Sequence, residues 1–169
     1  LSPHAASHGL RALTSSWARH HVNISLCRAK TSGHYVNSML ALNTAVKAGF
    51  DETIMLDPEG YVAEASAANV FLLRDSVIQL ARDVLGIEVK ERRITRDELY
   101  TADEAFLTGT AAEILPLREL DGRRIGTRAG APPLSEPVAA NSVTAQLQHL
   151  YRQAVRGELD AYRHWLTPA

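Results

Sequence analysis

The sequence has little cysteine, few aromatic side chains and no long hydrophobic stretch. Its 169 residues include one cysteine, Cys27, and aromatic residues make up 6% of the chain. A lone cysteine cannot form an internal disulfide bond, which favours a reducing compartment, and we expect the cytoplasm. The apolar runs are far shorter than the ~20 residues that cross a bilayer, and we expect no targeting segment.

An excess of charge of one sign is also missing. Eighteen basic residues face nineteen acidic ones, for a net charge of −1. This balance gives no electrostatic footprint for nucleic acid or for an anionic membrane, so small molecules are the expected partners. The seven histidines are scattered, and the adjacent pair His20 and His21 would point to opposite sides of an extended chain, so we expect no metal site.

What is present is an ordinary globular composition, 46% hydrophobic, with strands and helices that alternate along the chain. The first half predicts a strand at 9–20 and an extended piece at 22–27. A helix that ends at Gly49 follows, and its apolar face carries Tyr35, Met39, Leu42 and Val46. The next predicted elements are a β-hairpin of 52–56 and 61–65 around the turn at 57–60, a strand at 69–73, a helix from Val77 to Val84 and a strand at 87–94.

The second half contains two strong local signals. Thr95 and Glu98 have the spacing of a helix capping box, and Asp121-Gly122 is typical of a type I′ hairpin turn. The remaining predicted elements are an apolar strand before Gly109, hairpin strands at 114–120 and 123–125, a loop at 126–141, a helix with Val143, Leu147, Leu150 and Ala154 on one face, and a shorter helix with Tyr162, Trp165 and Leu166.

Three stretches carry candidate chemistry. Lys30 stands just before a helix, with Tyr35 within a few residues, although a lone lysine there is most often a solvated surface residue. Glu64 lies among residues too small to fill space. The turn that includes Gly109 and Thr110 can direct backbone amides toward a phosphate or carboxylate, but lacks the Gly-Lys-Ser/Thr ending of a nucleotide P-loop, and alone it is as readily a tight turn.

Together, these features suit a phosphorylated aldehyde cofactor. Pyridoxal phosphate needs a lysine amine for its Schiff base, a carboxylate at its ring nitrogen and an anchor for its phosphate. The runs RAKTSGHY (28–35), AEASAANVF (63–71) and FLTGTAAEI (106–114) resemble, in order and spacing, the fold type IV pyridoxal phosphate enzymes, and most closely the bacterial branched-chain amino acid aminotransferases.

The resemblance implies a role for each matching residue. Lys30 would form the Schiff base and shuttle the proton, Tyr35 would bind the cofactor's phenolic oxygen, and Glu64 would pair with the ring nitrogen. Gly109 and Thr110 would contact the phosphate, while the amides of Thr110 and Ala111 would receive the substrate carboxylate. The implied substrates are leucine, isoleucine or valine with 2-oxoglutarate.

The implied fold is an α/β pseudo-barrel of strands with outer helices, like the C-terminal domain of D-amino acid aminotransferase. D-Amino acid aminotransferase and aminodeoxychorismate lyase share the lysine and glutamate and are the alternatives, as is a non-catalytic fragment. The resemblance also implies a homo-oligomer, a dimer or a hexamer.

Two departures from the family pattern lead to further expectations. We expect residues 1–20 to be the end of an N-terminal domain that is otherwise missing, and 21–169 to be the cofactor-binding domain. Residues 74–76 join a strand directly to a helix where the family has a return strand and a phosphate loop. We therefore expect a cofactor-free chain that is interrupted between Asp75 and Ser76.

Overall fold

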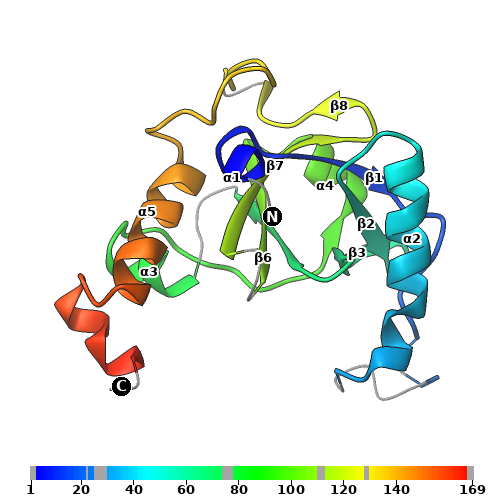
Figure 1. The fold of residues 1–169 in the computed structure, drawn as a ribbon, viewed down its shortest axis with the longest axis horizontal. Helices are drawn as coiled ribbons and strands as arrows, with labels where there is room; N and C mark the ends of the chain where they lie inside the picture. Colours follow the sequence, from blue (N-terminus) through cyan, green and yellow to red (C-terminus); the bar gives the residue numbers. More distant parts are fainter. Residues whose placement is uncertain are drawn as a thin grey trace.

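The computed structural model describes residues 3–21, 23–24, 30–73, 78–109, 113–127 and 130–166. Its centre is a curled mixed sheet of eight strands, with helices on the outside (Figure 1). The strands are β1 (Leu10–Thr14), β2 (Glu52–Leu56), β3 (Tyr61–Ala65), β4 (Asn69–Leu73), β5 (Ile94–Thr95), β6 (Glu104–Gly109), β7 (Glu113–Leu120) and β8 (Arg123–Arg124). The helices are α1 (Pro3–His8), η1 (Ser32–Tyr35), α2 (Val36–Lys47), α3 (Ile78–Asp83), α4 (Arg96–Tyr100), α5 (Val143–Val155) and η3 (Asp160–Trp165).

The strand order is β4-β6-β7-β1-β2-β3-β5, and β8 pairs with β7. β1 is parallel to both of its neighbours, β2 and β7, whereas the other pairs are antiparallel. The sheet curls until β3 approaches β4, and the Ala65 N–H donates to the Ala68 carbonyl at 2.8 Å between them. The expected pseudo-barrel with outer helices is therefore confirmed.

Apolar side chains from the strands fill the interior of this curl. The main core includes Leu10, Ala12, Ile54, Ala65, Leu99, Leu107, Leu115, Leu117 and Leu120. A second cluster of Ala81, Phe106, Ile114 and Leu147 lies where α3 and α5 meet the sheet. None of the helices in the described part of the chain is long and apolar enough to cross a membrane.

Most predicted elements are present. The hairpin of β2 and β3, the strand β4 and the helix α5 lie where the sequence placed them. The capping box at Thr95 is complete, because its Oγ1 accepts from the Glu98 N–H while Glu98 accepts from the Thr95 N–H. Asp121 and Gly122 have φ of 52° and 74°, as a type I′ turn requires.

Three predictions of extended structure need comment. The strand expected at 9–20 is only β1, residues 10–14, and the helix α1 before it was not predicted. The strand expected at 87–94 is wrong: residues 86–93 are irregular, because only Ile94 and Thr95 reach the edge of β3. The extended piece expected at 22–27 lies mostly outside the described residues. The expected division at residue 20 stays a prediction, and β1 lies in the middle of the sheet.

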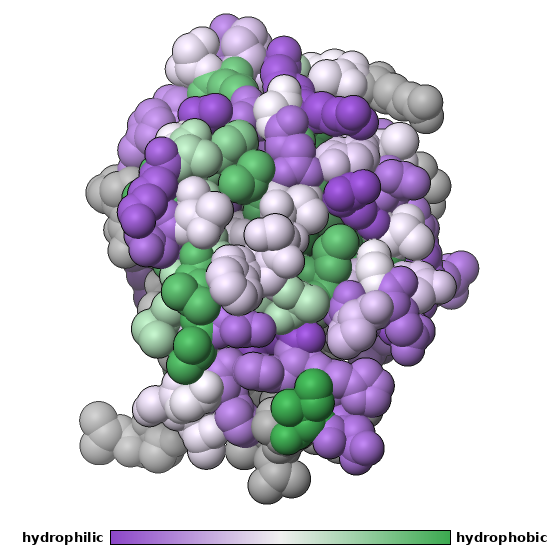
Figure 2. Space-filling view, turned by 90° about the vertical axis from the view of Figure 1, so that its right-hand side faces the viewer, coloured by the Kyte–Doolittle hydropathy of each residue, from purple (hydrophilic) through white to green (hydrophobic). Residues whose placement is uncertain are grey.

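The prediction for the packing face of α2 is also wrong. Its buried residues are the small side chains Ser38, Ala41 and Ala45, which let the helix approach β2 closely. Met39 and Val46, expected in the core, are 60% and 55% exposed, and Val36 and Leu40 are exposed as well. This side of the molecule faces the viewer in Figure 2, where apolar groups stand among polar ones.

Candidate active site

The candidate site is built at one end of the sheet, where β3 ends, β4 begins and β6 ends. Asn69, the first residue of β4, pairs with Thr108 near the end of β6. The short connection from Ala65 to Asn69 joins β3 to β4 at this same end. Glu64, next to the end of β3, and Gly109, the last residue of β6, are thereby brought to one rim of the sheet.

Lys30 and Tyr35 enter the site from the segment before α2. Lys30 is exposed and lies just before η1. The His34 N–H donates a hydrogen bond to the Thr31 carbonyl at 3.0 Å, which forms the first turn of η1. Tyr35 is the last residue of η1 and is half-buried. The structure thus places an exposed amine just before a short turn that ends in a half-buried phenol, and the predicted roles of Lys30 and Tyr35 stay predictions.

Glu64 projects from β3, opposite Met55 of β2, and is flanked by alanines on both sides. Its Oε1 lies 2.5 Å from Nε of Arg19, an ion pair whose side chains are 27% and 16% exposed. The guanidinium of Arg19 is the one charged partner that contacts this carboxylate among the described residues. A carboxylate can accept several hydrogen bonds, so Glu64 keeps acceptor capacity beyond this contact.

The electrostatics of Glu64 reflect this position. Burial raises the pKa of Glu64 above its ordinary value, and the charges of Arg19 and Lys30, with the hydrogen bond from Arg19, offset only part of the rise. Lys30 therefore lies within electrostatic range of the carboxylate. A half-buried carboxylate with a raised pKa and two cationic side chains in range is a frequent signature of a functional site.

The predicted anion turn is described only at its edges. Gly109 is the last residue of β6 and pairs with Glu113, the first residue of β7, which has a φ of 52°. Thr110 and Ala111 lie outside the described residues, as do Asp75 and Ser76, so their predicted roles and the predicted interruption stay predictions. The paired residues Gly109 and Glu113 bring the end of β6 and the start of β7 together at the same rim as Glu64.

Arg19 is the site residue that sequence reasoning missed. It follows the end of β1, and its backbone N–H donates to the Leu56 carbonyl at 2.8 Å. Strand periodicity could not identify it, because the strand formed there stops at Thr14. The signal available in the sequence was a basic residue upstream of Lys30, which has no specificity.

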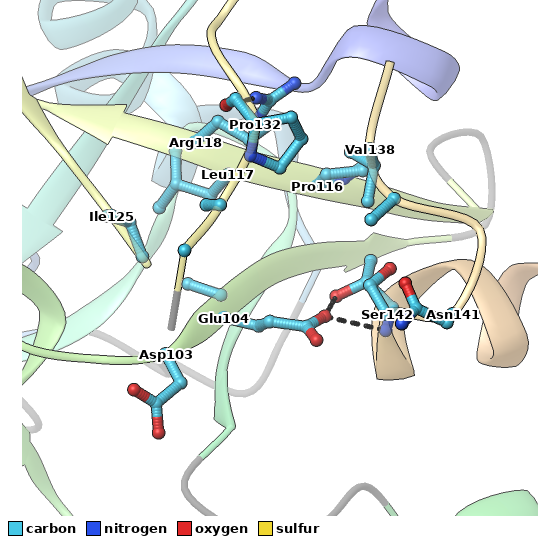
Figure 3. Close-up of a pocket in the computed structure, with 15 residues that line it drawn as sticks. Asp103, Glu104, Pro116, Leu117, Arg118, Ile125, Pro132, Val138, Asn141 and Ser142 are labelled. Carbon is cyan, nitrogen blue, oxygen red and sulfur yellow. Dashed lines mark hydrogen bonds between the residues drawn. The ribbon is translucent and has the colours of Figure 1, made fainter. Parts of the chain in front are cut away.

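A cavity of about 320 Å³ lies elsewhere, beside the start of β6 and the middle of β7 (Figure 3). Its lining includes Glu104, whose carboxylate accepts from the N–H groups of Val143 and Thr144 at 2.9 and 2.8 Å. Arg118 also lines the cavity and donates to backbone carbonyls of the loop, among them those of Glu136 and Pro133. These polar groups are occupied by the fold. Within the described ranges, no three acidic, histidine or cysteine side chains gather as a metal site would require.

Comparison with known proteins identifies the family. The profile of the amino-transferase class IV family matches residues 1–79 and 72–120. The chain belongs to this family. The two matched segments overlap at 72–79, the stretch in which the interruption is expected.

Within the family, the similar proteins are branched-chain aminotransferases. The chain is 45% identical to the branched-chain-amino-acid aminotransferase of Pseudomonas aeruginosa over 99% of its own length and 57% of that protein. The Thermobaculum terrenum branched-chain amino acid aminotransferase in its PLP form has a TM-score of 0.85 at 37% identity, covering 99% of this chain and 58% of that one. The Thermoproteus uzoniensis branched-chain aminotransferase with norvaline has a TM-score of 0.84 at 37% identity, covering 99% and 58%. The chain thus spans little more than half the length of these relatives.

Proposed function

We propose that this chain is the cofactor-binding part of a pyridoxal phosphate-dependent branched-chain amino acid aminotransferase. The observation that carries the proposal is the half-buried Glu64 carboxylate, which is paired with Arg19 at 2.5 Å and lies within electrostatic range of Lys30. Among the similar branched-chain aminotransferases, one structure is of the PLP form and another is with pyridoxamine 5′-phosphate, which supports the same cofactor here.

The side chains present fit this cofactor. A pyridine nitrogen that carries a proton needs an acceptor such as Glu64, and an aldehyde needs an accessible amine such as that of Lys30. When bound, pyridoxal phosphate supplies the aldehyde and an electron-withdrawing ring that stabilises negative charge at a substrate carbon.

In this proposal the named residues would bind the cofactor and the substrate. The Lys30 amine would form the bond to the cofactor and would move the proton at the substrate Cα, while Tyr35 would donate to the phenolic oxygen of the ring. Glu64 would keep the ring nitrogen protonated. The connection between β6 and β7 would receive the anions: Gly109 and Thr110 the phosphate, and the amides of Thr110 and Ala111 the substrate carboxylate.

The proposed substrates are leucine, isoleucine or valine, with 2-oxoglutarate as the amino acceptor. The names of the similar proteins support the branched-chain substrates over those of a D-amino acid aminotransferase or aminodeoxychorismate lyase. Because the chain spans little more than half of these relatives, the complete site is proposed to need further protein. A homo-oligomer and a cytoplasmic location, favoured by the single cysteine, are part of the same proposal.

The test is to add pyridoxal phosphate to the purified protein, reduce it with borohydride and map the labelled peptide. We expect the pyridoxyl group on Lys30, an absorption band of the lysine-bound cofactor before reduction, and neither signal in Lys30→Ala. A label on Lys47 or Lys90 would refute the assignment. Without any label or band, the chain would be the non-catalytic fragment.

A further inference from the structure

One half-buried arginine joins the candidate carboxylate to the segment that follows the candidate lysine. Arg19 Nε lies 2.5 Å from Glu64 Oε1 in β3. Its Nη1 donates at 3.0 Å to the carbonyl of His34, which lies in η1 between Lys30 and Tyr35. The backbone N–H of Arg19 also donates to the Leu56 carbonyl at the end of β2. Arg19 therefore connects β2, β3 and η1 through contacts that are not part of the pairing between strands.

The His34 carbonyl is a shared acceptor. It also receives Nε2 of His20 at 3.1 Å, so two consecutive residues, Arg19 and His20, fix the same point of η1. Because η1 is a single short turn, its position depends on such contacts more than on its own hydrogen bonds. A displacement of η1 would move Lys30 and Tyr35 relative to Glu64.

A second arginine–glutamate pair provides a matched comparison. Arg11 Nε donates to Glu119 Oε1 at 2.8 Å, and its Nη1 donates to the Gly49 carbonyl at 3.3 Å, which is the same pattern of one glutamate and one backbone carbonyl. The Arg11 pair is a complete hydrogen bond. The Arg19 pair is a contact of 2.5 Å to one oxygen of a half-buried carboxylate at the candidate site, and a carboxylate can accept further hydrogen bonds beside it.

We propose that Arg19 is a positioning residue that fixes the Glu64 carboxylate relative to Lys30 and Tyr35, so that it meets the ring nitrogen of a bound pyridine cofactor. This inference rests on the proposed function. The contacts that carry it are the ion pair to Glu64 and the bond to the His34 carbonyl, which belong to one guanidinium. Without Arg19 the carboxylate and η1 would lose their common anchor, and each could move independently of the other.

The test compares Arg19→Met with Arg11→Met in the full chain. Both changes remove a guanidinium that bridges a glutamate and a carbonyl, but only Arg19 is at the site. We expect the affinity for added pyridoxal phosphate, measured by absorbance titration, to fall about tenfold or more in Arg19→Met and to stay unchanged in Arg11→Met. Arg19→Lys keeps the charge but not the double bridge, so an intermediate affinity is expected.

A double-mutant cycle separates positioning from general damage. If Arg19 acts through Glu64, Arg19→Met should weaken cofactor binding much less in a Glu64→Gln background than in the wild-type chain. In the cofactor-free protein, hydrogen exchange across residues 31–36 should accelerate in Arg19→Met and not in Arg11→Met. This readout requires no cofactor.

The outcomes also separate this inference from the proposed function. A wild-type chain that never acquires the band of lysine-bound cofactor would overturn both. Normal binding in the wild type, with equal affinity in Arg19→Met or strictly additive effects with Glu64→Gln, would overturn the role of Arg19 alone. If Arg19→Met does not fold, Arg19→Lys in the same cycle decides the question.

Discussion

The two ends of the sheet treat polar groups differently. At the end away from the candidate site, Glu104 accepts three hydrogen bonds from the start of α5, and Arg118 donates to four backbone carbonyls. At the site end, the carboxylate of Glu64 is contacted by one guanidinium among the described residues, that of Arg19, and is less saturated than the carboxylate of Glu104. A saturated network stabilises the fold, whereas an unsatisfied group retains binding capacity for a ligand. The cavity lined by Glu104 and Arg118 is therefore not the candidate site.

The largest effect should come from the unsaturated end. Glu64→Gln nearly preserves shape but removes the charge that pairs with a ring nitrogen. We expect turnover to fall at least a hundredfold, about 2.7 kcal/mol of transition-state stabilisation, while the cofactor still binds. Steady-state rates at saturating pyridoxal phosphate, in the protein that includes the further part proposed to complete the site, measure this, with Glu88→Gln on the surface as the control. Near-normal turnover in Glu64→Gln would remove this residue from the mechanism.

A change at the other end of the sheet, around Glu104 and Arg118, should lower the free energy of unfolding instead. Arg118 is 8% exposed, and Arg118→Met would leave several carbonyls of the loop without a donor. We expect a loss of about 3 kcal/mol in the free energy of unfolding, with unchanged cofactor affinity in the protein that remains folded. Urea denaturation measures the loss. Arg123→Met, on the exposed side of the same hairpin, should cost less than about 1 kcal/mol; equal losses in both variants would contradict the comparison.

A smaller effect is expected at the start of α5, beside Glu104. Ser142 caps this helix, and its side chain accepts from the Ala145 N–H at 3.1 Å. Ser142→Ala should cost about 1 kcal/mol of stability, and Ser142→Asp should restore most of it. The thermal midpoint reports both. A cap that contributes nothing would leave all three proteins with the same midpoint.

The smallest effect is a pH dependence at α4. The Arg92 side chain and the Thr95 N–H lower the pKa of Glu98 from 4.5 to about 2. A carboxyl whose pKa is lowered by folding stabilises the fold above its unfolded pKa, and the contribution disappears as the pH falls from about 4.5 toward 2. Thermal unfolding of Glu98→Gln should therefore depend less on pH in this window than that of Asp97→Asn. Identical profiles would show that Glu98 contributes no such linkage.

The sequence predicted the hairpins and caps well because their signals are local. Asp121-Gly122 needs only two residues with positive φ, and the capping box at Thr95 needs only a glutamate three positions on. The face of α2 could not be predicted this way. Periodicity shows where the apolar side chains of a helix lie but not which side of the helix packs on the sheet. In α2 the side that faces β2 carries small side chains, among them Ala41 and Ala45, because the helix packs close to the strand.

The candidate site follows the same division. Lys30 and Glu64 were found because each has a distinctive local setting, a turn before a helix and a strand of small residues. Arg19 was missed because its contacts, with Glu64 and with the His34 carbonyl, exist only after β3 and η1 have assembled. The irregular stretch at 86–93 shows the converse, since alternation there suggested a strand that has no partner along most of its length.

The central position of β1 has a consequence for how the chain is made. β1 lies near the start of the sequence, yet one of its parallel partners is β7, and Leu10 pairs with Leu117. During synthesis, β1 and β2 can associate early, but the other edge of β1 stays unpaired until β7 has left the ribosome. Pairing between strands so far apart in the sequence forms slowly, and until then the unpaired edge of β1 can pair with other chains and cause aggregation. Expression at lower temperature or with chaperones should therefore raise the soluble yield more than changes at the candidate site would.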